Sequence, residues 1–150
     1  MVDLSNETMI HKRKNGIEFL QFRKLLEYPE IVHCYTLKAN GFDIAGNDTY
    51  EEKKKILYAN FETLAGALGI RKETIIRPYQ THTNIVKRVD EAPKKLTIFP
   101  EELTNVDGLI TDREDITFSL GFADCTPIYL YDPVKKAIRK YSFWLEGNSW

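Results

Sequence analysis

Residues 49–68 read TYEEKKKILYANFETLAGAL and carry the clearest periodic pattern of the chain. Apolar side chains recur in this range at helical spacing, at Ile56, Leu57, Phe61, Leu64, Ala65 and Leu68. The charged run at residues 51–55 falls on the solvated side, and Gly69 is the residue type that commonly ends a helix. The pattern therefore predicts one long helix from Thr49 to Leu68.

Runs of β-branched and aromatic residues on both sides of this helix predict short strands. They are residues 17–22 and 31–36 before the helix and residues 74–77, 84–89, 108–111, 116–120 and 127–131 after it, with a loop at 41–48 and a turn at Asp132-Pro133. One long helix among so many strands indicates a mixed α/β (α+β) fold. No repeat, low-complexity tract or linker divides the chain, so we expect residues 1–150 to form a single domain.

Composition narrows the class of protein and of partner. Of the 150 residues, 43% are hydrophobic, which is enough for a core. The 21 Lys and Arg nearly balance the 22 Asp and Glu, so no net field favours a nucleic acid or an anionic membrane as partner. The N-terminal residues lack the pattern of a signal peptide, and no apolar run is long enough to span a membrane. We therefore expect a cytoplasmic protein with reduced thiols.

Two polar motifs beside predicted strands contain the residues most suited to chemistry. They are Gln80-Thr81-His82 and Ala123-Asp124-Cys125. His82 and Cys125 offer an imidazole and a thiolate, which zinc accepts, but a zinc site normally has a third protein ligand. Taken alone, a histidine such as His82 is more often a hydrogen-bonded structural residue, and a free cysteine such as Cys125 more often a small buried apolar side chain.

The remaining histidines and the second cysteine have no such motif around them. His33 lies in a predicted strand, where we expect a structural role. His11 lies in a polar stretch beside Lys12, where we expect it to be exposed. Cys34 is expected to lie in the core.

Four motifs occur in order along the chain: Gln80-Thr81-His82, residues 107–111 (DGLIT), residues 123–128 (ADCTPI) and Tyr131-Asp132-Pro133. Together they resemble the YfiH family, also called the multicopper polyphenol oxidase or laccase-domain family, whose members include purine nucleoside phosphorylases and a peptidoglycan editing factor. The resemblance extends to residues 33–36 and the predicted helix. It implies an αββα-layered domain that continues well past these motifs.

The resemblance implies metal-assisted chemistry with purine nucleoside and phosphate as partners. The family activities are phosphorolysis of purine nucleosides and deamination of adenosine, and the implied cofactor is zinc, with copper as the alternative. His82 and Cys125 correspond to two of the family's metal ligands. Apart from the resemblance, we expect Asp124, beside Cys125, to assist proton transfer, so our candidate catalytic residues are His82, Asp124 and Cys125.

The family's third ligand is a histidine in a His-x-Gly-Trp motif, one strand after Asp132-Pro133, and this chain has no histidine there. Residues 139–147 can be back-translated as AGG AAA TAT TCA TTC TGG TTG GAA GGG, followed by the A of the next codon. Read one base later, these codons give Gly-Asn-Ile-His-Ser-Gly-Trp-Lys-Gly, with the histidine at the position of Ser142. We therefore hypothesise that residues 139–150 are an out-of-frame tail, and that the chain is an incomplete YfiH-like domain, inactive for want of this ligand.

Three other functions remain open. A metal-free cysteine hydrolase would use Cys125 as nucleophile and His82 as base. A laccase-like polyphenol oxidase would need more copper ligands than three histidines in the whole chain supply. A non-catalytic fragment would neither bind metal tightly nor turn over substrate. An incomplete domain would also expose apolar sheet surface, so we expect self-association.

Overall fold

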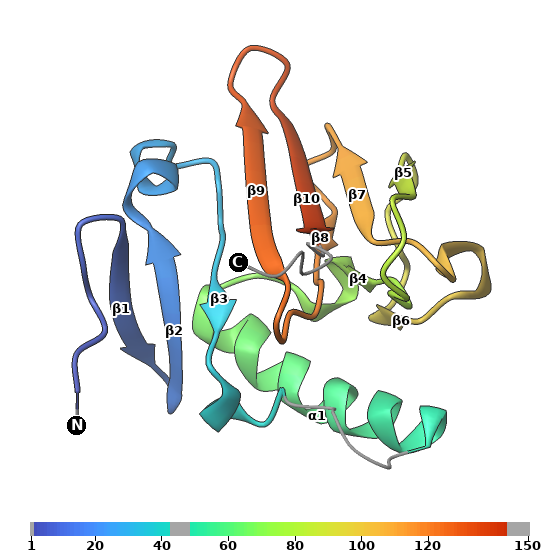
Figure 1. Ribbon diagram of the computed structural model, residues 1–150, viewed down its shortest axis with the longest axis horizontal. Coiled ribbons are helices and arrows are strands. Elements are labelled where there is room, and N and C mark those ends of the chain that lie inside the picture. The colour runs from blue at the N-terminus through green and yellow to red at the C-terminus, as the bar shows by residue number, and fades with distance from the viewer. Residues whose placement is uncertain (1, 43–48, 144–150) are drawn as a thin grey trace, which may run out of the picture. The chain divides into compact units, whose positions relative to one another are not determined.

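The computed structural model describes residues 2–42 and 49–143 (Figure 1). The chain divides into two compact units, residues 1–72 and residues 73–150, and each has its own sheet structure. Both helix and strands are present in the described residues, so the predicted mixed α/β class is confirmed. In this part of the chain no helix has both the length and the apolar character that crossing a membrane requires.

The first unit contains a three-stranded antiparallel sheet in the order β1-β2-β3 and the long helix α1. The elements are β1 Met9–Lys14, β2 Ile17–Phe22, β3 Tyr35–Thr36 and α1 Tyr50–Leu68, with 3-10 helices at Arg23–Glu27 and Lys38–Asn40. Asn15 and Gly16 join β1 to β2 with φ angles of 52° and 78°. Two successive positive φ angles are the conformation of the tight hairpin turn that an Asn-Gly pair favours.

Helix α1 confirms the prediction made from its periodicity. The Thr49 hydroxyl accepts a hydrogen bond from the Glu52 amide at 3.3 Å, and the Glu52 carboxylate accepts one from the Thr49 amide at 2.7 Å. These two bonds satisfy donors that would otherwise be unpaired at the helix N-terminus. Gly69, with a φ of 72°, ends the helix in the left-handed conformation, as its residue type predicted.

The strand predicted over residues 31–36 is wrong for most of its length, because only β3 at Tyr35–Thr36 pairs with β2. Before β3 the chain is fastened by side chains. The His33 ring nitrogen Nε2 accepts a hydrogen bond from the Phe22 amide at 2.8 Å, and the Gln21 side chain donates to the His33 carbonyl at 2.8 Å. His33 is buried, and it has the structural role that was predicted.

The prediction that His11 is exposed is also wrong. Residues 9–14 form β1, which places the His11 side chain against β2, and that side chain is only 5% exposed. Its Nε2 atom lies 3.3 Å from a carboxylate oxygen of Glu18, and its Nδ1 atom accepts a hydrogen bond from the Leu4 amide. The basic neighbours of His11 in the sequence therefore did not indicate its environment.

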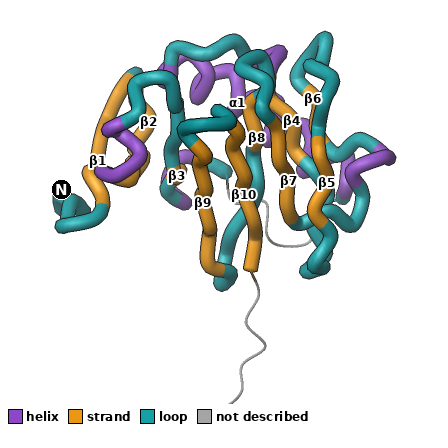
Figure 2. The backbone as a smooth tube through the Cα atoms, turned by 90° about the horizontal axis from the view of Figure 1, so that it is seen from above, coloured by secondary structure: helices purple, strands orange, loops and turns teal. Residues whose placement is uncertain are grey.

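The second unit contains two sheets. One sheet is parallel, with the strand order β6-β4-β8. The other sheet has the strand order β5-β7-β10-β9, and Figure 2 shows its strands side by side. The strands are β4 Ile75–Arg77, β5 Val86–Arg88, β6 Thr97–Ile98, β7 Gly108–Thr111, β8 Thr117–Phe118, β9 Thr126–Asp132 and β10 Ala137–Phe143, with 3-10 helices at Lys72–Thr74 and Glu101–Leu103. Strand β7 has the predicted bounds, whereas β6 was not predicted. The predicted turn at Asp132-Pro133 joins β9 to β10, and the Asp132 carboxylate accepts hydrogen bonds from the amides of Val134 and Lys135.

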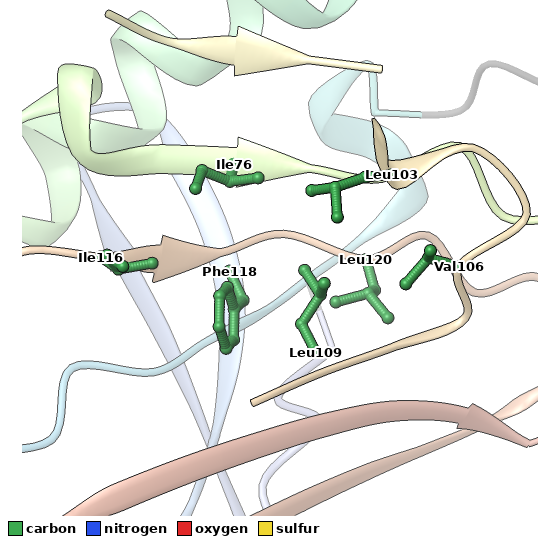
Figure 3. Packing of buried hydrophobic residues seen from close by; sticks show 7 residues of the cluster. All are labelled: Ile76, Leu103, Val106, Leu109, Ile116, Phe118 and Leu120. Atoms are coloured by element: carbon green, nitrogen blue, oxygen red, sulfur yellow. The ribbon is translucent and has the colours of Figure 1, made fainter. Parts of the chain in front are cut away.

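An apolar cluster holds the strands of the second unit together (Figure 3). It contains the buried side chains of Ile76, Leu103, Val106, Leu109, Ile116, Phe118 and Leu120. These residues come from β4, β7, β8 and the chain beside them. Because close-packed cores resist displacement, the loops that leave these strands start from fixed positions. Of the residues predicted for the functional site, His82 lies in one of these loops, and Asp124 and Cys125 lie immediately before β9.

Candidate functional site

His82 lies in the loop between β4 and β5, and its backbone has a φ of 61°. This left-handed conformation is uncommon for residues other than glycine and persists only where the surroundings hold it. The His82 amide donates a hydrogen bond to Asp107 Oδ1 at 3.1 Å. The His82 side chain is exposed, so the loop presents the imidazole at the surface of the second unit.

Asp107 is the buried anchor of this loop. It immediately precedes β7 and is 2% exposed. Its carboxylate accepts hydrogen bonds from the backbone amides of Thr81, His82 and Thr83, each at 3.1 Å, and from the Thr83 hydroxyl at 3.1 Å. Hydrogen bonds to an ionised acceptor are stronger than neutral ones. Four of them on one carboxylate fix the backbone from which the His82 side chain projects.

Cys125 lies immediately before β9, half-buried, with a free thiol, and Asp124 beside it is exposed. The segment that leads to Cys125 is joined to the His82 loop by Gln80 and Gly121. The Gln80 side chain donates to the Gly121 carbonyl at 3.0 Å and accepts from the Gly121 amide at 2.7 Å. Gln80 precedes His82 by two residues and Gly121 precedes Cys125 by four, so this pair of bonds brings the two predicted site segments together.

Strand β10 passes next to the start of β9. Ser142 pairs with Pro127, and Phe143 pairs with Thr126, the residue directly after Cys125. Position 142 therefore lies opposite the second residue of β9, whereas Cys125 lies in the bend directly before that strand. Of the hypothesised out-of-frame tail at residues 139–150, residues 144–150 lie outside the described residues.

The donor atoms of this site suit zinc in kind but fall short in number. An imidazole and a thiolate are among the ligands that zinc prefers, and a catalytic zinc site uses three protein ligands. In residues 2–42 and 49–143 no group of three His, Cys, Asp or Glu side chains is placed to hold a metal ion. The sequence has no histidine after His82, so the second unit can supply only one imidazole. The residues present therefore do not form a complete zinc site.

Arg77, the last residue of β4, is a neighbour of the site that the sequence did not single out. Its side chain is 7% exposed, and burial lowers the pKa of its guanidinium to about 10. Its Nη1 atom donates to the Ser119 hydroxyl at 3.2 Å. Its Nη2 atom lies where a side chain on Gly121 would begin, closer than a real Cβ atom could come. The one feature of the sequence that could have indicated Arg77 is its position as a charged residue at the end of an apolar strand.

Comparisons with known proteins agree with the arrangement of these motifs. Residues 40–140 match the model of a family described as "Multi-copper polyphenol oxidoreductase laccase". The chain is similar to "Adenosine deaminase RL5" of an unknown prokaryotic organism, with 39% identity over 72 residues that cover 47% of this chain and 28% of that protein. It is also similar to "Purine nucleoside phosphorylase SERP0752" of Staphylococcus epidermidis, with 26% identity over 113 residues that cover 70% of this chain and 43% of that protein.

The fold is similar to that of a solved structure, the Bacillus licheniformis hypothetical protein YfiH. The TM-score is 0.69 at 19% identity, over 92% of this chain and 52% of that chain. The chain thus spans less than half the length of these two curated relatives and about half the length of the solved one. The family match covers most of the chain and includes both site motifs, and on this ground the chain belongs to the YfiH family of laccase-domain proteins.

Proposed function

We propose that this chain carries part of a purine nucleoside site of the YfiH type, and that His82 and Cys125 are two of its three zinc ligands. Two relatives are named as a purine nucleoside phosphorylase and an adenosine deaminase, which supports this substrate class. The observation that carries the proposal is the pair of hydrogen bonds between Gln80 and Gly121, because it joins the two ligand segments. A reaction on nucleosides and phosphate fits a cytoplasmic location, which we also propose.

In phosphorolysis a phosphate oxygen forms a bond to the sugar carbon C1′ while the glycosidic C–N bond breaks. The purine leaves with the electron pair of that bond and takes up a proton. Asp124 is the exposed carboxylate next to Cys125, and we assign it to the handling of this proton. Asp107 acts by holding the His82 backbone, since its carboxylate already accepts four hydrogen bonds from the loop.

We further propose that residues 139–150 are out of frame and that position 142 is the place of the missing ligand. The strand register supports the place of the ligand, because Ser142 pairs with Pro127, two residues after Cys125. A site with two donors loses both affinity and the geometry that keeps one metal position open. We therefore expect the chain as it stands to release little or no base from adenosine, inosine or guanosine.

The test is to sequence the coding DNA from the codon of Asp132 onward, and to express the reading frame that restores the histidine at position 142. The restored protein, loaded with zinc, is then assayed for release of free base with and without phosphate, and for deamination of adenosine. We expect turnover that a chelator abolishes and zinc restores. A next frame without His-x-Gly-Trp would refute the out-of-frame tail, and a restored protein without activity on any purine nucleoside would refute the proposed substrate class.

Laccase-like oxidation is the second candidate, because the matching family carries that activity in its description. It requires copper and further ligands beyond the three histidines of the chain. Copper-dependent oxidation of a phenol by the restored protein, without base release, would favour it. A metal-free cysteine hydrolase would instead be inhibited by iodoacetamide and unaffected by a chelator, and a non-catalytic fragment would show none of these activities.

A further inference from the structure

Arg77 is a buried cation without a matching anion in the described part of the chain. Its guanidinium carries a full charge at neutral pH, and its side chain is only 7% exposed. Burial is the sole cause of its lowered pKa, which means that no neighbouring carboxylate among the described residues offsets the charge. A buried charge is costly unless it is paired, so such a residue calls for a partner.

The hydrogen bonds of Arg77 leave donors available. A guanidinium has five N–H donors in a planar fork. In the described residues, Nη1 donates to the Ser119 hydroxyl, whereas the buried Nε atom has no hydrogen-bond acceptor. Buried polar atoms are nearly always satisfied, so an orphaned donor on a buried cation points to an acceptor that the described side chains do not supply.

The position of Arg77 in the fold is also that of a ligand-binding residue. Arg77 ends β4, the central strand of the parallel sheet β6-β4-β8, and Ser119 follows β8 directly. In parallel α/β sheets, ligands bind outside the carboxyl ends of the strands. Gln80, Ser119 and Gly121, which lie around the guanidinium, are each partly exposed, so the charge lies just below the surface at this edge.

We propose that Arg77 and Ser119, beside the Gln80–Gly121 junction, form an oxyanion site that takes inorganic phosphate. Phosphate matches the planar fork of an arginine through two parallel charge-assisted hydrogen bonds, and a serine hydroxyl can donate a third. The junction joins this site to the segments of His82 and Cys125. A role as the phosphate subsite of phosphorolysis rests on the proposed function, whereas phosphate binding itself does not.

The test is calorimetric titration of the full chain with inorganic phosphate, at constant ionic strength, with a chelator and without nucleoside. The variants are Arg77→Met, Arg77→Lys and, as a matched control, Arg113→Met, which removes an exposed arginine paired with Asp115. We expect phosphate to bind the original chain and Arg113→Met equally, and Arg77→Met at least about tenfold more weakly. The affinity of Arg77→Lys for phosphate should lie between those of the original chain and Arg77→Met, because lysine keeps the charge and loses the planar fork of donors.

Thermal melting of the same proteins tests whether the partner of Arg77 is phosphate or a carboxylate elsewhere in the chain. Without phosphate, Arg77→Met should melt at the same temperature as the original chain or higher, because it removes an unpaired buried charge. Added phosphate should raise the melting temperature of the original chain and leave that of Arg77→Met unchanged. The proposal would be overturned if the original chain and Arg77→Met bound phosphate equally, or if neither bound it. It would also be overturned if Arg77→Met melted well below the original chain both with and without phosphate. None of these measurements depends on nucleoside turnover, so failure of the proposed function would leave them unaffected.

Discussion

At the scale of single residues, Asp107 determines how the His82 loop is held. Replacing Asp107 with Ala leaves the backbone amides of Thr81, His82 and Thr83 without their acceptor, whereas the Thr83 hydroxyl keeps the Asn105 carbonyl at 2.7 Å. We expect Asp107→Ala to lower the free energy of unfolding by about 3 kcal/mol. Asp107→Asn keeps one acceptor oxygen and should lose about half as much. Urea denaturation followed by circular dichroism measures both values.

The matched control for Asp107 is Asp112→Ala, which removes an exposed aspartate of the same unit. Its partner, Arg88, is also exposed, and surface ion pairs contribute about 0–1 kcal/mol. If Asp107→Ala and Asp112→Ala were equally stable, Asp107 would not be the anchor of the loop.

Gly121 is a second residue whose identity the structure explains. A Cβ atom at this position would collide with Arg77 Nη2. We expect Gly121→Ala to lower the free energy of unfolding by about 1–3 kcal/mol, because the buried guanidinium would have to move. Arg77→Met replaces the charged end with a flexible apolar one, so in the double variant the cost of the added methyl group should fall. A double-mutant cycle measures this coupling, and additive effects of the two changes would show that the contact does not determine the residue at position 121.

At the scale of secondary structure, the cap of α1 gives a prediction in the first unit. Thr49→Ala removes the hydroxyl that accepts from Glu52 and should destabilise the helix by about 1 kcal/mol. Thr63→Ala is the control, since Thr63 is an exposed residue inside the same helix, where alanine has the higher helix propensity. In thermal melting followed by the circular dichroism signal of the helix, Thr63→Ala should have a higher melting temperature than Thr49→Ala. The reverse order would contradict the role of the cap.

The elements also show what sequence reasoning can and cannot reach. Helix α1 was predictable because periodicity, cap and terminal glycine all agree on its bounds. Strand β1 was missed although Asn15-Gly16 carries a hairpin signal, because the strand itself is polar and lacks clear alternation. The segment before β3 was mistaken for a strand because apolar content cannot reveal that its hydrogen bonds go to the side chains of Gln21 and His33.

In the candidate site, too, some residues could be identified from the sequence and others could not. His82 and Cys125 could be proposed as site residues because they stand in recognisable local motifs. Arg77 could not, since its setting depends on Ser119 and Gly121, which lie more than forty residues away in the sequence. Contacts of this range depend on the pairing of β4 with β8 and have no local pattern.

At the scale of the whole molecule, we propose that the chain self-associates through the sheet β5-β7-β10-β9. In the described residues β9 stands at one end of this sheet order, and Leu130 on it is 49% exposed. An edge strand with an exposed apolar side chain can pair with a second copy. Leu130→Lys should lower the average mass in sedimentation, whereas Val134→Lys, in the turn after β9, should not. A chain that is monomeric throughout would exclude self-association.

We propose that His82 and Cys125 are two ligands of one metal site whose third position is 142. The most direct measurement is zinc affinity, by competition with a chromophoric chelator, for the chain and for His82→Ala, Cys125→Ser and Ser142→His. We predict weak binding of one zinc ion that either of the first two changes abolishes, and binding at least about tenfold tighter in Ser142→His. Zinc affinity that is the same in all four proteins would contradict the claim.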